Sequence, residues 1–143
     1  MTIFTGAATA IITPFKSGEI DYENLAKLIE FQIENKIDAI VVAGTTGEAA
    51  TLSELEYKKL LKETVKYVAN RVPVIAGSGS NSTQKAIEQS KWAKEAGVDA
   101  LLVVNPYYNK GTQKSVIAHY KAILDSVDCP IIVYMYLAEL EWI

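Results

Sequence analysis

The sequence predicts an α/β fold with one parallel β-sheet, and two observations point to it. Short apolar runs recur about every 30 residues, which is the size of one βα unit. Stretches with helical periodicity fill the intervals, and strict alternation of this kind implies parallel strands joined by right-handed crossovers. An open doubly wound sheet and part of a (βα)8 barrel both satisfy the pattern, and periodicity does not separate them.

Five apolar runs are predicted to be strands. All but the first are almost continuously apolar, as expected for parallel strands covered on both faces. The predicted strands span residues 6–12, 39–43, 73–77, 100–104 and 130–134. No linker, low-complexity segment or charge run divides them, so one domain is expected.

Four amphipathic stretches are predicted to be helices. Asp21 is a plausible N-cap of the first, Ser53 and Glu56 form a capping box at the second, and Gly97 is a C-terminal stop for the third. The apolar positions of the fourth, which include Ile117 and Leu124, recur at helical spacing. The predicted helices span residues 21–35, 53–68, 83–96 and 112–126.

Composition excludes several classes of protein. Half of the residues are hydrophobic, 22% are charged, and the net charge is −3, which favours a soluble globular protein without a nucleic-acid partner. The apolar runs are too short to cross a bilayer and no signal peptide is expected, so a cytoplasmic location is predicted. The single cysteine, Cys129, is expected to pack, and the single histidine, His119, lies within a predicted helix. No metal site is therefore expected.

Two glycine-rich loops follow predicted strands, where ligands bind in both architectures. Residues 44–48 read Gly-Thr-Thr-Gly-Glu, and the hydroxyls of Thr45 and Thr46 with nearby N–H groups could hold a small carboxylate. The alternative is a turn that only caps a helix. Residues 77–83 form either an anion-binding loop at a helix N-terminus or a flexible turn with a cap, and they lack the lysine of a P-loop.

Tyrosines mark the ends of the last two predicted strands. Tyr107 and Tyr108 are adjacent on a loop, where a phenol can relay protons or anchor an interface. Tyr134 ends the fifth strand, and a tyrosine at such a position is more often structural than catalytic. These alternatives stay open on local grounds.

Five motifs, taken together, resemble a known family. They lie at residues 6–10 with 13–15, 44–48, 74–77, 106–110 and 130–134. In their order and spacing they are similar to the dihydrodipicolinate synthase (4-hydroxy-tetrahydrodipicolinate synthase) family of pyruvate-dependent lyases. The resemblance implies the N-terminal half of a TIM (βα)8 barrel, with about five parallel strands and four helices, over residues 1–134. The sister N-acetylneuraminate lyases usually carry Ser-Thr at positions 45–46, so that alternative, with the keto-deoxy-sugar aldolases, is less favoured.

The resemblance implies a Schiff-base mechanism in lysine and diaminopimelate biosynthesis. A lysine amine condenses with pyruvate, and the enamine attacks aspartate semialdehyde without a cofactor. On this basis Thr46 holds the pyruvate carboxylate, and Thr45, Tyr134 and Tyr108 form a proton relay. Tyr108 would enter the site of a neighbouring subunit, so a homo-oligomer is expected.

The resemblance also implies an interface pocket that binds lysine as an inhibitor in some members. Here that pocket would include Ala50, Asn81 and Tyr107. Inhibited members carry a carboxylate where this chain has Lys85, and a cation repels a cationic effector. Weak or absent feedback by lysine is therefore expected.

Residues 135–143 depart from the family, which continues Asn-Val-Pro-Gly-Arg-Thr-Gly after Tyr134. The possible codons of this tail, regrouped after one added base, can encode the missing motif. A chain frameshifted or truncated after Tyr134 is therefore expected, with an engineered origin as the alternative. The Schiff-base lysine belongs one βα unit further on. We thus expect the 143-residue chain to be inactive, or to serve as a non-enzymatic oligomerising fragment.

Overall fold

A five-stranded parallel sheet forms the centre of the molecule. The computed structural model describes residues 2–135, so the predicted tail lies outside the described residues from position 136 onward. The predicted strands are confirmed, the first being shorter than expected. In spatial order, which is also chain order, they are β1 (Ala8–Ala10), β4 (Ala39–Val42), β5 (Val74–Gly77), β6 (Ala100–Val104) and β7 (Ile131–Tyr134).

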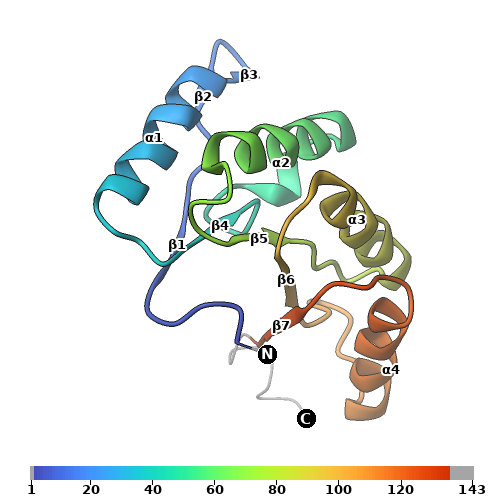
Figure 1. Ribbon diagram of the computed structural model, residues 1–143. Coiled ribbons are helices and arrows are strands. Elements are labelled where there is room, and N and C mark those ends of the chain that lie inside the picture. Colours follow the sequence, from blue (N-terminus) through green and yellow to red (C-terminus); the bar gives the residue numbers. More distant parts are fainter. Residues whose placement is uncertain (1, 136–143) are drawn as a thin grey trace.

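Four helices cover one face of this sheet, each between two consecutive strands (Figure 1). The predicted caps are confirmed: Asp21 accepts from the Asn24 N–H, Ser53 and Glu56 form the reciprocal capping box, and Gly97 ends its helix at φ +92°. Neighbouring helices pack on one another in chain order. The helices are α1 (Tyr22–Glu34), α2 (Glu54–Val68), α3 (Thr83–Ala96) and α4 (Gln113–Leu124).

Two short elements were not predicted. An antiparallel hairpin, β2 (Phe15–Lys16) with β3 (Glu19–Ile20), turns through Ser17 and Gly18, which both have positive φ. Two-residue strands are too short for alternation of apolar residues to reveal them. A single 3₁₀ turn, η1 (Ala49–Thr51), follows β4 and leads the chain toward α2.

Alternate strand residues serve two separate cores, which explains the continuous apolar runs. Ile40, Val42 and Leu101 face the helices and join the larger cluster. Val41 and Ile75 belong to the smaller cluster on the other face, against which Ile3 and Phe4 pack. Because both faces of each central strand are covered, no polar alternation appears in the sequence.

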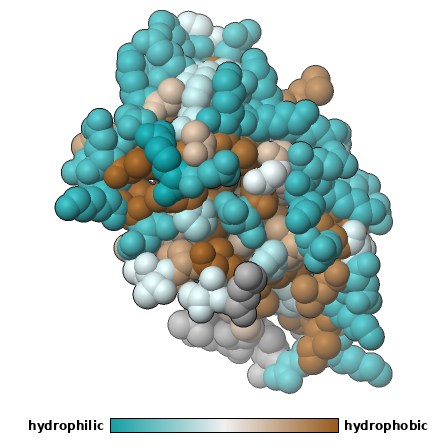
Figure 2. Space-filling model, in the orientation of Figure 1, coloured by the Kyte–Doolittle hydropathy of each residue, from teal (hydrophilic) through white to brown (hydrophobic). Residues whose placement is uncertain are grey.

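Hydrophobic side chains remain exposed on α4 and at the β7 edge of the sheet. Ile117 is 68% exposed and Leu124 is 54% exposed, so these two members of the helically spaced apolar set on the fourth helix point away from the core. Val133 on β7 is 52% exposed. Figure 2 shows hydrophobic atoms gathered over the region where Figure 1 places α4. Patches of this kind mark surfaces that association can cover.

His119 lies within α4, as predicted, and is buried there. The ring is 4% exposed, and its Nδ1 lies 2.9 Å from Thr83 Oγ1. Burial lowers the pKa of His119, so the folded chain keeps the ring neutral at a pH where the unfolded chain protonates it. The stability that this provides is present above the ordinary histidine pKa and is lost as the pH falls toward the folded value.

We therefore expect the free energy of unfolding to fall between about pH 7 and pH 5, and His119→Gln to remove that part of the slope. Urea denaturation followed by circular dichroism at each pH measures both chains. Carboxylates with lowered pKa values, such as Glu56, change the stability at lower pH, and they are present in both the unaltered chain and the variant. Equal slopes for the two chains would show that His119 does not cause the pH dependence.

Candidate functional site

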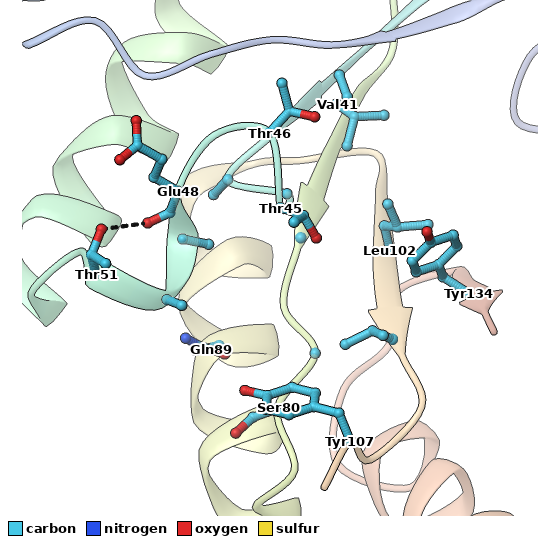
Figure 3. Close-up of a pocket in the computed structure, with 18 of the residues that line it drawn as sticks. Val41, Thr45, Thr46, Glu48, Thr51, Ser80, Gln89, Leu102, Tyr107 and Tyr134 are labelled. Carbon is cyan, nitrogen blue, oxygen red and sulfur yellow. Dashed lines mark hydrogen bonds between the residues drawn. The ribbon is translucent and has the colours of Figure 1, made fainter. Parts of the chain in front are cut away.

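A cavity of about 560 Å³ opens at the carboxyl ends of the five strands. Every strand contributes to its lining, from Ala10 on β1 to Tyr134 on β7. This is the edge at which parallel α/β folds place their ligands. Figure 3 shows Thr45 on one side of the cavity and Tyr134, beside Leu102, on the other.

The loop of residues 44–48 forms one wall of this cavity. Its turns are closed by the Gly47 N–H donating to Gly44 O (3.1 Å) and the Glu48 N–H donating to Thr45 O (3.0 Å). Thr45 and Thr46 are exposed and line the cavity. The loop runs into η1, whose N-cap is Glu48 without a side-chain hydrogen bond, whereas α2 takes its cap from Ser53. Two hydroxyls facing a cavity can donate hydrogen bonds to a carboxylate.

The loop of residues 77–83 is chiefly a structural turn. Ser82 caps α3 by accepting from the Lys85 N–H (3.4 Å). Ser78 is fully buried and accepts a hydrogen bond from Ser90 Oγ (3.0 Å). Gly79 and Ser80 nevertheless line the cavity. The predicted helix cap is confirmed, and the anion-binding alternative stays a prediction.

The structure separates the three predicted tyrosines. Tyr134 and Tyr107 line the cavity and are 43% and 38% exposed. Tyr108 is 90% exposed, has φ +69°, and is not part of the cavity lining. The structure thus brings together Thr45, Thr46 and Tyr134, and leaves Tyr108 on the outer surface of its loop.

Most of the residues predicted for an effector line the same cavity. Ala50, Lys85 and Tyr107 line it, whereas Asn81 does not; the Asn81 carbonyl accepts from Asn109 Nδ2 (2.8 Å). Gln89, which sequence reasoning missed, also lines the cavity. Its spacing of four residues from Lys85 on α3 places both on one helix face, and that spacing was the available signal.

Outside the cavity, Cys129 belongs to the larger core cluster, as predicted. Cys129 is buried, and burial raises the pKa of its thiol. Trp92 packs against Tyr57, with Lys58 Nζ 3.9 Å from the Trp92 ring centroid. Within residues 2–135, no three His, Cys, Asp or Glu side chains are grouped to hold a metal ion. Over the same range no helix is both long and apolar enough to span a bilayer.

Comparison with known proteins gives a consistent set of relatives. The model of the "Dihydrodipicolinate synthetase family" matches residues 3–137. The 4-hydroxy-tetrahydrodipicolinate synthase of Clostridium tetani is 58% identical over 134 residues, which are 94% of this chain and 46% of that protein. The chain thus spans about half the length of the relatives it matches.

Solved structures show the same correspondence. Dihydrodipicolinate synthase from Thermotoga maritima superposes with a TM-score of 0.93 at 44% identity, over 96% of this chain and 46% of that one. The chloride-inhibited enzyme from Acinetobacter baumannii, solved as a complex with pyruvate, gives 0.92 at 48% identity, over 96% and 47% of the two chains. The five parallel strands and four helices correspond to the N-terminal half of such TIM barrels, and the chain belongs to the dihydrodipicolinate synthetase family.

Proposed function

We propose that this chain is the pyruvate-holding half of a 4-hydroxy-tetrahydrodipicolinate synthase, a lyase of lysine and diaminopimelate biosynthesis in the cytoplasm. The observation that carries the proposal is the meeting of Thr45, Thr46 and Tyr134 around one cavity at the strand ends. Relatives above 50% identity bear this enzyme's name, and a relative superposing at 0.92 was solved with pyruvate.

Each of these side chains has a role in the proposed reaction. A lysine amine adds to the keto carbon of pyruvate and water leaves, and the resulting enamine carbon then bonds to the aldehyde carbon of aspartate semialdehyde. The Thr46 hydroxyl and neighbouring N–H groups hold the pyruvate carboxylate. Thr45 and Tyr134 pass protons to and from the reacting oxygens. Tyr108, exposed and outside its own cavity, extends the relay into a neighbouring subunit.

The 143 residues are proposed to hold pyruvate without capturing it covalently. The family resemblance places the Schiff-base lysine beyond Tyr134, in the half of the relatives that this chain does not span. Lys85, on α3, is the lysine in the described cavity lining (Figure 3 shows Gln89, four residues further along the same helix). The carboxylate-binding and the covalent functions are therefore separable in this chain.

Replacing Thr46 by Val is expected to weaken pyruvate binding roughly tenfold or more, because a hydrogen bond to a charged acceptor is lost while side-chain volume is kept. Titration of the ¹⁵N-labelled chain, followed through the amides of residues 44–48, gives the affinity. Thr5→Val, at an exposed threonine outside the cavity, is the matched control. Equal affinities of the Thr46 and Thr5 variants would contradict the proposed carboxylate site.

Lysine is proposed not to act as an effector of this chain. Lys85 puts a positive charge in the wall of the cavity that Ala50 and Tyr107 also line, and it repels the cationic amino acid. We expect millimolar L-lysine to leave the amide signals of this region unchanged, and Lys85→Glu to introduce binding. Lys91→Glu makes the same charge change on an exposed part of α3 and is expected to introduce none. Clear saturation of the unaltered chain by L-lysine would refute this.

A non-enzymatic role as an oligomerising fragment is the second candidate. The observation that favours it is the exposure of Ile117, Leu124 and Val133, together with the exposed Tyr107 and Tyr108 loop. Open sheet edges and apolar patches promote association between copies. Light scattering at micromolar concentration is expected to show an oligomer, and a clean monomer would count against this role.

A further inference from the structure

A buried phenol connects α2 to the strand end beside the Thr45–Thr46 loop. Tyr57 is 2% exposed, and its hydroxyl donates to the Gly77 carbonyl at 2.8 Å. Burial raises the pKa of Tyr57 well above the usual value, so the phenol stays neutral and remains a donor. The hydroxyl is the side-chain group that ties the last residue of β5 to the helix layer.

Gly77 in turn lies directly against the start of the loop. A Cβ built on Gly77 would lie 2.2 Å from Ala43 O and 2.9 Å from Gly44 Cα. Ala43 is buried and has φ +52°, a left-handed conformation that a residue with a side chain keeps only when its surroundings hold it. The position of Gly77 therefore determines where the loop departs from β4.

The other end of the loop is fixed by a second buried hydroxyl. Thr13 is 4% exposed, and its Oγ1 donates to Gly47 O at 2.7 Å. A Cβ on Gly47 would come within 3.2 Å of Ala43 N and Ile11 O, so this glycine also sits tightly against its neighbours. The two threonines that line the cavity are thus held between two side-chain anchors.

We infer that Tyr57 is a positioning residue for the Thr45–Thr46 loop, acting through Gly77 and assisted at the far end by Thr13. Tyr57 does not contact the substrate. It fixes the position at which the loop that does so leaves β4. Its consequence for pyruvate binding rests on the proposed function, whereas its consequence for the loop does not.

Tyr57→Phe is the direct test, because it removes the hydroxyl and keeps the ring. Tyr120→Phe is the matched control: Tyr120 of α4 donates to Val103 O at 3.2 Å, also joining a helix to a strand carbonyl, and burial raises its pKa to about 12. Both variants lose one phenol–carbonyl bond and are expected to lose similar stability. Only Tyr57→Phe is expected to loosen the loop.

Two readouts separate positioning from stability. Amide hydrogen exchange of Gly47 and Glu48, whose N–H groups close the loop, is expected to be roughly fivefold faster in Tyr57→Phe and unchanged in Tyr120→Phe. Pyruvate affinity is expected to fall by a similar factor in Tyr57→Phe only. Thr13→Val should reproduce both effects. Thr13→Ser, which keeps the hydroxyl, should show the exchange rates and the pyruvate affinity of the unaltered chain.

The possible outcomes distinguish the positioning role of Tyr57 from the proposed carboxylate site. Selective loosening of the loop with weaker pyruvate binding supports both the positioning role and the proposed function. Selective loosening in a chain that binds no pyruvate supports the positioning role and refutes the carboxylate site. Identical exchange rates and affinities in Tyr57→Phe and Tyr120→Phe would overturn the positioning role, whatever the chain binds.

Discussion

Gly77→Ala is expected to lower the free energy of unfolding by about 3 kcal/mol, or to prevent folding altogether. The added Cβ would lie 2.2 Å from Ala43 O and 2.8 Å from Ala43 C, and both are backbone atoms that no side-chain rotation can move. To relieve this overlap, β5 has to move away from the end of β4, where Val42 pairs with Ala76. The cavity wall would then lose its geometry along with its stability.

The matched control is Gly44→Ala, one residue into the loop. A Cβ there meets only Val41 Cγ1 at 3.7 Å, an ordinary contact. We expect this variant to unfold within about 0.5 kcal/mol of the unaltered chain in urea. If Gly77→Ala changed the free energy of unfolding as little as Gly44→Ala, Gly77 would not lie as close to Ala43 as the structure shows.

Leu60→Ala is expected to cost about 3 kcal/mol of unfolding free energy. Leu60 is fully buried in the helix-side core, on the helix that packs against α1, α3 and β5. Truncation removes its transfer free energy and leaves a cavity that three neighbouring elements can only partly fill. Urea denaturation followed by far-ultraviolet circular dichroism measures the change.

Leu55→Ala provides the comparison within the same helix. Leu55 is 80% exposed, so shortening it removes little buried surface, and a change near zero is expected. Similar losses in the two leucine variants would mean that the face of α2 that carries Leu60 does not pack against the core. A large difference would confirm the orientation of α2 over the sheet.

Much of the fold was predictable because local rules and packing agree. The run at residues 39–43 is continuously apolar because Ile40 and Val41 serve different cores on opposite faces of β4. The capping box of Ser53 and Glu56 marks the start of α2 with two reciprocal hydrogen bonds. Each of these signals lies within a few consecutive residues, so no tertiary information was needed.

The remaining features depend on contacts between distant segments. Gln89 lies four residues after Lys85 on α3, and that spacing points to the cavity only once the structure has placed Lys85 there. Asn81 was expected in the effector pocket from the family resemblance, and the structure leaves it out of the cavity lining. The anchoring role inferred for Tyr57 likewise depends on a glycine 20 residues away in the chain.

Reductive trapping with pyruvate tests the central claim most directly. The 143-residue chain is incubated with pyruvate and borohydride and its intact mass is measured, with the full-length Clostridium tetani relative treated in parallel as the expected positive. We predict that the relative gains a reduced pyruvyl group while this chain keeps its unmodified mass. A reduced pyruvyl adduct on Lys85, or on any other lysine of this chain, would contradict the account of a site that holds pyruvate without bonding to it.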